Sequence, residues 1–303
     1  MKVKDGIIGF IVGDALGLPV EFHSINELIK NPVTKMIGYE THNMPRGTWS
    51  DDTSLTLATL TSITNSQGFD WDDIMNEFAQ WFYNGKYTQY NNAFDYGVTT
   101  STPLNKYKKG IPALECGGKS DRYVDNGSLM RMLPLSFLPK PNFEHVDKLS
   151  SLTHANEIAK IGCSLYVEIG RSMVYNDLSL KEHVINSSKR VMKYYADSNE
   201  LQKFKRITDF NFFGGVFSSR HIVDTLECCI YCLETSNSFK DAVLKAVNLG
   251  STSDTLGAVC GGLAGIYYGF DEIPIDWIEQ IPYINKVLPL CEKYEEFCKI
   301  YWG

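Results

Sequence analysis

The chain has 303 residues, of which 44% are hydrophobic and 21% charged, so it is long and apolar enough to bury a substantial core. Its formal net charge of −7 argues against a general nucleic-acid-binding protein, because such proteins carry a basic surface. No long block of Lys and Arg is present, which argues against attachment to an anionic membrane surface.

The segment 1–17 superficially resembles a signal peptide, but Asp14 interrupts its apolar stretch and no small-residue cleavage site follows. The longest uncharged run, 255–270, is shorter than the roughly 18 residues expected of a membrane span. We therefore expect a cytoplasmic protein without a membrane partner. The eight cysteines lack the paired motifs of a zinc site, so we expect buried free thiols.

Apolar residues recur at three- and four-residue spacing along most of the chain, which is the pattern of helices. Strand-like alternation is scarce, and neither repeats nor low-complexity linkers divide the sequence. These observations predict one all-α domain over 1–303. Long polar loops are expected at 23–49, 84–127 and 176–220, the last of which could be partly helical. Helices are predicted at 5–17, 52–64, 71–83, 155–175, 221–234, 239–248, 255–268 and 275–300.

Two stripes of glycine mark the first and the seventh of these predicted helices. Residues three or four positions apart lie on one face of a helix, and each glycine costs about 1 kcal/mol of helix stability relative to alanine. A stripe of this kind indicates that another backbone approaches closely, so the two helices are candidates to pack together. The residues are Gly6, Gly9, Gly13 and Gly17 in the first stripe, and Gly257, Gly261, Gly265 and Gly269 in the second.

Carboxylates and hydroxyls stand together at the starts of two predicted helices, as Ser-Asp-Asp-Thr at 50–53 and Thr-Ser-Asp-Thr at 252–255. Ser, Thr and Asp are also the preferred residues for capping a helix N-terminus, so one such cluster alone would indicate a cap. Both clusters contain more carboxylate and hydroxyl groups than the capping of a helix requires. Since hard cations prefer oxygen ligands, the pair favours a site for a divalent metal ion.

Seven motifs in order resemble the ADP-ribosylglycohydrolase family, which includes dinitrogenase-reductase-activating glycohydrolases and ADP-ribosyl-acceptor hydrolases. The resemblance extends over about residues 5 to 270. The motifs are GDALGLPVEF (13–22), RGTWSDDTSLTLA (46–58), FDYGVTT (94–100), DNGSLMRMLPL (125–135), THANEIA (153–159), HIVDTLECCIYCL (221–233) and NLGSTSDTLGAVCGGLAGIYYG (248–269).

The resemblance implies a compact single-domain orthogonal helical bundle with a central metal cleft that holds two Mg²⁺ or Mn²⁺ ions. It implies a hydrolase that removes ADP-ribose from an ADP-ribosylated protein, on arginine as in bacterial relatives. The metal ligands that it implies are Ser50, Asp51, Asp52, Asp254 and Thr255, with Thr252 at a further ligand position.

The resemblance also implies residues that act on the substrate. Glu21 or Asp95 is expected to act on water or on the scissile bond, and the choice between them stays open. The turn 125–131 resembles one that cradles a diphosphate, and His154 resembles a histidine that contacts the nucleotide. The substrate-binding residues are therefore Asn126, Gly127, Ser128, Met130 and His154. Without the resemblance, Glu21 would be interpreted as a buried carboxylate at a helix end and Asp95 as the cap of a turn. His154 would be interpreted as a residue at a helix start that caps a neighbour.

Two positions depart from the family pattern. Thr252 stands where an aspartate ligand is expected, which substitutes a neutral ligand for an anionic one and weakens one of the two metal positions. Asp125 occupies a position usually held by glycine, beside the expected diphosphate. An alternative function is therefore a weakened family member that binds ADP-ribose or a modified partner without efficient turnover. A third is an interaction role that blocks an ADP-ribosyltransferase toxin.

Overall fold

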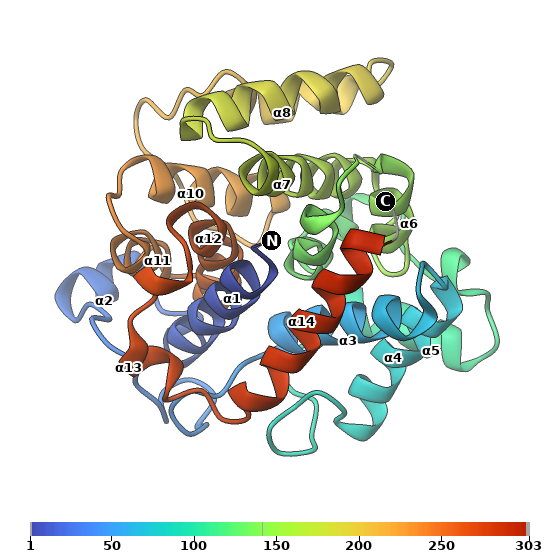
Figure 1. Ribbon diagram of the computed structural model, residues 1–303, viewed down its shortest axis with the longest axis horizontal. Coiled ribbons are helices and arrows are strands. Elements are labelled where there is room, and N and C mark those ends of the chain that lie inside the picture. The colour runs from blue at the N-terminus through green and yellow to red at the C-terminus, as the bar shows by residue number, and fades with distance from the viewer. Residues whose placement is uncertain (1, 141, 301–303) are drawn as a thin grey trace.

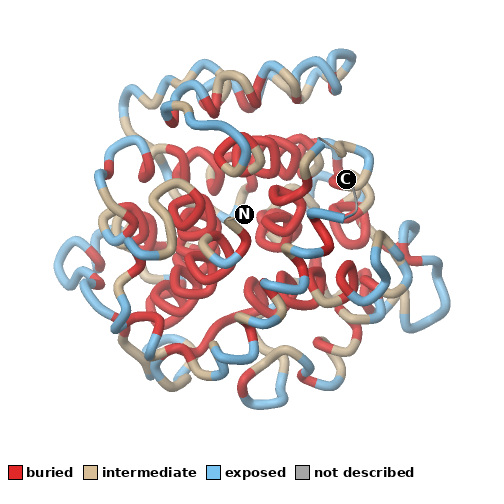
Figure 2. The backbone as a smooth tube through the Cα atoms, viewed as in Figure 1, coloured by how far each residue is buried: buried red, intermediate tan, exposed pale blue. Residues whose placement is uncertain are grey.

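Two helices from opposite ends of the sequence, α1 (Val3–Gly17) and α12 (Ser253–Tyr268), pack against each other inside the molecule (Figure 1). The computed structural model describes residues 2–140 and 142–300. Both helices are buried on almost every side, and Figure 2 shows them mainly in red. Because they are apolar all round, they have the sequences of core helices rather than of surface helices.

The glycine stripes of α1 and α12 face each other, so the packing that the sequence indicated is present. A Cβ atom added at Gly13 would lie 1.9 Å from the carbonyl oxygen of Gly257, and one at Gly17 would lie 2.1 Å from that of Ser253. These are backbone atoms, which cannot rotate away from an added methyl group. The pairing runs antiparallel, so the C-terminal end of α1 meets the N-terminal end of α12.

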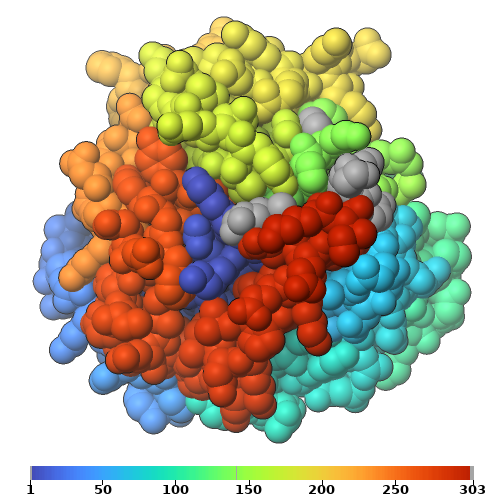
Figure 3. Space-filling view, viewed as in Figure 1, coloured from blue at the N-terminus to red at the C-terminus, as the bar shows by residue number. Residues whose placement is uncertain are grey.

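The other α-helices surround this pair at various angles (Figure 1). They are α2 (Ile25–Lys30), α3 (Asp51–Ser66), α4 (Trp71–Asn84), α5 (Val98–Lys108), α6 (Phe143–Ser151), α7 (Glu157–Tyr175), α8 (Leu180–Tyr194), α9 (Lys205–Thr208), α10 (Ile222–Glu234), α11 (Phe239–Val247), α13 (Ile275–Ile278) and α14 (Ile284–Ile300). Figure 3 shows α14 lying across the surface, where it contacts α1 and α3.

Short 3-10 helices connect several of these elements: η1 (Leu18–Val20), η2 (Ala113–Glu115), η3 (Asp121–Tyr123), η4 (Leu129–Arg131), η5 (Leu133–Phe137), η6 (Asn199–Phe204) and η7 (Phe270–Glu272). Within the described residues no β-sheet is present, and isolated bridges join Gly118 to His154 and Asp125 to His221. The all-α prediction is confirmed. All eight cysteines are buried and free, as expected.

Most predicted helices occur within a few residues of their expected bounds. The prediction of one helix at 275–300 was wrong, because α13 ends at Ile278 and Tyr283, with φ of 63°, turns the chain before α14. The expected loops at 23–49 and 84–127 contain α2 and α5. Ser24 caps α2 in a capping box, whereas α5 carries Pro103 and β-branched residues that sequence propensity disfavours.

The expected loop at 176–220 contains α8, whose start is fixed by a capping box between Ser179 and Glu182. Its buried side chains recur on one face, which is the pattern of an amphipathic helix packed on α7. Among the helices described, none combines the length and the apolar character that crossing a membrane requires.

Gly13→Ala should destabilise the protein, because the added methyl group would overlap the Gly257 carbonyl oxygen and force the central helices apart. Overpacking of a close contact costs about 1–3 kcal/mol of unfolding free energy, and more where backbone must move. Gly6→Ala is the matched control, because its Cβ would meet side-chain atoms of Phe137 and Ile266. Urea unfolding measures both variants, and equal losses would contradict the importance of the backbone contact.

Candidate metal centre and substrate cleft

Asp14 on α1 fixes the start of α3. The backbone amide of Ser50 donates to both carboxylate oxygens of Asp14, at 3.0 and 3.1 Å. Thr53 donates to Oδ2 of Asp14 through its amide at 3.1 Å and its hydroxyl at 2.6 Å. Asp14 is fully buried, and burial raises its pKa to about 7 despite these donors. It therefore joins the central helix pair to the first acidic cluster.

The chain after α1 turns sharply at Glu21 and Phe22. Phe22 has φ of 67°, a left-handed conformation that is rare for a bulky residue. Its amide donates to the carbonyl oxygen of Ser251 at 2.7 Å, and the amide of Ser251 donates to that of His23 at 2.9 Å. These hydrogen bonds hold the turn against the segment before α12. Glu21 is thereby placed beside the second acidic cluster.

The two acidic clusters meet, and a loop carboxylate joins them. Asp51 lies in the first turn of α3, Asp254 lies in the first turn of α12, and Asp95 precedes α5. One carboxylate oxygen from each of these residues lies within 4.8 Å of the others. Asp52 contacts the same group from α3, since the Thr255 hydroxyl donates to its Oδ2 at 3.3 Å. Three chain segments thus place carboxylates at one point.

Burial and mutual repulsion act on these carboxylates in the same direction. Burial, followed by the charges of neighbouring carboxylates, raises the pKa values of Asp51 and Asp254 well above their ordinary range. Burial is also the largest cause that raises the pKa of Asp52. It raises the pKa values of Glu21 and Asp95 to about 7. The cluster is therefore costly to ionise without a compensating positive charge.

The residues present fit a divalent cation. Buried oxygens of three carboxylates, Asp52 Oδ1, Asp95 Oδ2 and Asp254 Oδ1, have no hydrogen-bond partner within the described part of the chain. Buried polar atoms are ordinarily paired, so unpaired carboxylate oxygens at one place indicate a missing positive partner. Carboxylates and hydroxyls are the ligands that Mg²⁺ and Mn²⁺ prefer.

A cavity of about 440 Å³ extends from this acidic cluster. The turn at 125–127, Arg220 and the aromatic residues Phe22, Phe94 and Tyr96 line the same cavity. The lining residues are Glu21, Phe22, Asp51, Asp52, Ala93, Phe94, Asp95, Tyr96, Gly97, Thr99, Thr100, Asp125, Asn126, Gly127, Met130, Arg220, Thr252, Asp254 and Thr255.

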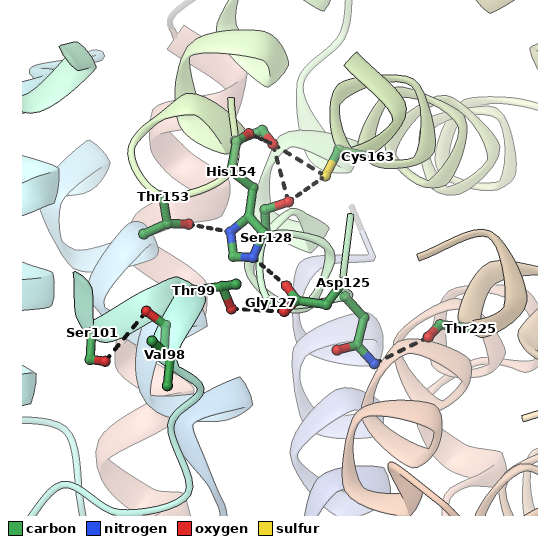
Figure 4. A network of polar contacts seen from close by, with 12 residues as sticks. Val98, Thr99, Ser101, Asp125, Gly127, Ser128, Thr153, His154, Cys163 and Thr225 are labelled. Atoms are coloured by element: carbon green, nitrogen blue, oxygen red, sulfur yellow. Dashed lines mark hydrogen bonds and ion pairs between the residues drawn. The ribbon is translucent and has the colours of Figure 1, made fainter. Parts of the chain in front are cut away.

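A polar network behind the 125–128 turn holds its shape (Figure 4). Asp125 accepts a hydrogen bond from the Thr99 hydroxyl at 2.8 Å and pairs with Nε2 of the fully buried His154. Nδ1 of His154 lies 2.6 Å from the Thr153 hydroxyl. Burial opposes ionisation of Asp125, but the hydrogen bond and charge of His154 bring its pKa below the ordinary value. The carboxylate of Asp125, at a position where the family usually has glycine, is thus paired with side chains inside the protein.

The structure brings most of the predicted site residues to the cavity and leaves three behind it. Ser50 donates its hydroxyl to Asp52 Oδ2 at 3.1 Å. Ser128 lies 3.4 Å from Cys163 Sγ and accepts from Ser150 at 3.1 Å (Figure 4). His154 supports the turn through Asp125. The predicted residues that line the cavity are Glu21, Asp51, Asp52, Asp95, Asn126, Gly127, Met130, Thr252, Asp254 and Thr255.

Three residues near the cluster were missed by sequence reasoning. The only signal for Asp14 was a carboxylate within an otherwise apolar helix. His42, whose Nε2 lies 2.6 Å from Glu21 Oε2, and Arg220, which lines the cavity, both come from segments predicted as loops. Their positions depend on the paths of those loops, and neither residue belongs to a recognisable local motif.

Comparison with known proteins identifies the family of this chain. The model of the family described as ADP-ribosylglycohydrolase matches residues 1–301. The chain belongs to the ADP-ribosylglycohydrolase family. A relative in Serratia proteamaculans, the ADP-ribosylarginine hydrolase Tri1, is 26% identical over 299 residues, which cover 96% of this chain and 78% of that protein. The resemblance drawn from the sequence motifs is confirmed.

Two further matches extend over almost the whole chain. The ADP-ribosyl-[dinitrogen reductase] glycohydrolase of Rhodospirillum rubrum is 28% identical over 286 residues, covering 92% of this chain and 90% of the relative. A solved structure titled ADP-ribosylglycohydrolase-related protein complex superimposes with a TM-score of 0.78 at 26% identity and covers 98% of both chains. The all-helical architecture is therefore the fold of this family.

Mg²⁺ or Mn²⁺ should raise the melting temperature, by roughly 5–10 °C at about 100 times Kd, and more at about pH 8 than at about pH 6. Because burial raises the pKa values of Glu21 and Asp95 to about 7, the metal-free fold holds protons that the unfolded chain releases. These protons stabilise the fold at low pH, and that contribution is lost as the pH rises through about 7.

A bound cation would replace those protons, so its effect should be largest where they have been released. Thermal unfolding in EDTA and in added metal, at both pH values, measures the difference. No shift on adding metal, or a larger shift at the lower pH, would be inconsistent with a carboxylate metal site.

Proposed function

We propose that this protein is a metal-dependent hydrolase that removes ADP-ribose from an arginine side chain of an ADP-ribosylated protein. The observation that carries the proposal is the cluster of unpaired buried carboxylates in a cavity that Asn126 and Gly127 also line. The Serratia relative is named an ADP-ribosylarginine hydrolase, which supports arginine as the modified side chain.

The metal ion, Mg²⁺ or Mn²⁺, would be held by Asp51, Asp52 and Asp254, with the Thr255 hydroxyl beside them. When bound, such an ion polarises ribose hydroxyls and acidifies a bound water. The Ser50 hydroxyl orients Asp52 by donating to its Oδ2, so Ser50 supports the ligands from behind. Thr252 stands at the edge of the same group, where its hydroxyl accepts a hydrogen bond from Asn126 Nδ2 at 3.2 Å.

Glu21 and Asp95 are suited to proton transfer. Hydrolysis of the glycosidic bond requires a proton to leave the attacking water and a proton to reach the departing arginine nitrogen. A carboxyl whose pKa lies near 7 gives up or accepts a proton readily at neutral pH. Burial brings both residues to that range, and both line the cavity beside the metal ligands.

The turn at 126–128 is suited to binding the diphosphate. Within the described residues, the backbone amides of Gly127 and Ser128 make no hydrogen bond to the protein. Successive free amides in a turn bind anions, and Arg220, which lines the same cavity, adds a positive charge. A Cβ at Gly127 would lie 2.9 Å from Cε1 of His154, so this turn accepts no side chain there.

The alternative is a family member that binds ADP-ribose or a modified partner without efficient turnover. Thr252 supports it, because a neutral hydroxyl at an expected ligand position gives the cluster one negative charge fewer. Asp95 supports the hydrolase instead, since its carboxylate lies with those of Asp51 and Asp254 and adds negative charge to the same group.

The hydrolase proposal predicts release of ADP-ribose from arginine-modified protein in the presence of Mg²⁺ or Mn²⁺. Glu21→Gln should lower kcat by about 10²–10⁴-fold and leave ADP-ribose binding largely unchanged, because a proton-transfer group is lost while the cavity keeps its shape. Glu40→Gln, at an exposed carboxyl on the following loop, is the control and should retain full activity. If the wild type releases no ADP-ribose at any metal concentration yet binds it, the alternative is favoured.

Thr252→Asp tests whether the natural threonine limits the site. We expect metal affinity to rise by about tenfold, because a carboxylate supplies ligand charge that a hydroxyl lacks. Isothermal titration with Mn²⁺ measures the affinity, and the release assay measures the rate. A large rise in both would mean that the natural protein is weakened. An unchanged or lower affinity would show that the site functions without a carboxylate at this position.

A further inference from the structure

Five large apolar side chains are exposed on two neighbouring segments of the surface. Phe22, which lines the cavity, is 63% exposed, and Ile25 and Ile29 on α2 are 45% and 70% exposed. Phe213 and Phe217, on the loop between α9 and α10, are 96% and 76% exposed. Scattered apolar residues are ordinary on a protein surface, but a contiguous group of them marks an interaction site. We call these five side chains the apolar patch.

Backbone contacts hold the two segments of the patch side by side. The Ser218 hydroxyl donates to the carbonyl oxygen of Gly250 at 2.7 Å. A Cβ atom added at Gly250 would lie 3.1 Å from the amide nitrogen of Ile25. The amide of Phe22 donates to the carbonyl oxygen of Ser251, the next residue along the chain, at 2.7 Å. These contacts join the loop before α10 to the turn at the start of α2, so the exposed side chains of the two segments lie close together.

The loop that carries Phe213 and Phe217 has a defined shape. The Arg206 guanidinium donates to the carbonyl oxygen of Gly215 at 2.7 Å, and Gly214 and Gly215 turn the chain with left-handed φ of 91° and 82°. Glycine adopts these angles without strain, because it has no Cβ atom. The backbone of this loop therefore places both phenylalanine rings at the surface, as the left-handed turn at Phe22 does for its own ring.

Phe22 connects the apolar patch to the cavity. It follows Glu21 directly in the chain, and both residues line the cavity. Arg220 also lines the cavity and comes three residues after Phe217, and three residues span at most about 10 Å. In the proposed function the scissile bond lies beside Glu21. A polypeptide attached to that bond therefore leaves the cavity past Phe22 and meets the patch.

We propose that the apolar patch docks the polypeptide that carries the ADP-ribosylated arginine, and that it selects targets with apolar side chains beside that arginine. This inference rests on the proposed function, which places the arginine end of the substrate at Glu21. Aromatic side chains are enriched at protein interfaces, where they bury a large apolar area. A second copy of this chain is the other occupant to consider. Because Phe22 lines the cavity, a dimer formed on the patch would compete with the substrate for that ring.

The test compares two peptides that share a central ADP-ribosylarginine, one flanked by leucine and phenylalanine and the other by serine and glycine. Fluorescence anisotropy in the Glu21→Gln background measures binding without fast turnover. We expect the apolar-flanked peptide to bind about tenfold more tightly, and Phe213→Ser combined with Phe217→Ser to remove that preference. Free ADP-ribose should bind equally with and without the two substitutions, because neither phenylalanine lines the cavity. Ile300→Ser, at a 74% exposed residue of α14 outside the patch, is the matched control.

The outcomes separate this inference from the proposed function. Equal affinity for the two peptides, or a preference that survives the double substitution, overturns the docking surface and leaves the hydrolase intact. A preference that the double substitution removes, in a protein whose wild type releases no ADP-ribose, supports the docking surface and overturns the hydrolase. Failure to bind either peptide or free ADP-ribose overturns both proposals.

Analytical ultracentrifugation tests the second copy as the occupant of the patch. A wild-type dimer that Phe217→Ser dissociates would overturn the proposal, whereas a wild-type monomer supports it. Circular dichroism melting checks that the double variant folds, and Phe217→Ser alone provides a second variant with a smaller change of surface.

Discussion

The unbalanced negative charge of the buried carboxylates is the constraint on which this site depends. Asp51, Asp52 and Asp254 are almost wholly buried and lie next to other acids, and Asp52 and Asp254 each leave a buried carboxylate oxygen unpaired. Buried charge of one sign is among the most costly arrangements in a protein. A divalent cation would remove that cost, and in the proposed function it would also polarise the ribose hydroxyls. The instability of the metal-free cluster and its proposed activity have the same physical cause.

The closeness of the two central helices determines where this charge gathers. Glycine on both helices lets α1 and α12 approach until Gly13 and Gly257 meet backbone to backbone. That contact brings the C-terminal end of α1, with Asp14, against the start of α12. Asp14 then holds the start of α3 through three donors. Core packing and site geometry are therefore not separate features, since a shift between the helices would separate the carboxylates.

Much of this arrangement was predictable from local patterns. The helix starts at 50–53 and 252–255 carry their chemistry in adjacent residues, and the glycine stripes indicated which helices would pack. The rest depends on long-range packing. His42 reaches Glu21 from the middle of a loop, and the 125–128 turn buries the Ser128 side chain against Cys163, which no spacing rule specifies. Helix α5 forms despite Pro103 because it packs against α4.

The most direct test of the central claim is the thermal stability of Asp254→Asn with and without Mn²⁺. The variant keeps the size of the side chain and removes one negative charge. The account predicts that without metal it melts roughly 2–5 °C above the wild type at about pH 8, and that Mn²⁺ no longer stabilises it. Asp197→Asn, at an exposed carboxyl, should change neither value. A variant that melts below the metal-free wild type and still gains stability from Mn²⁺ would refute the claim.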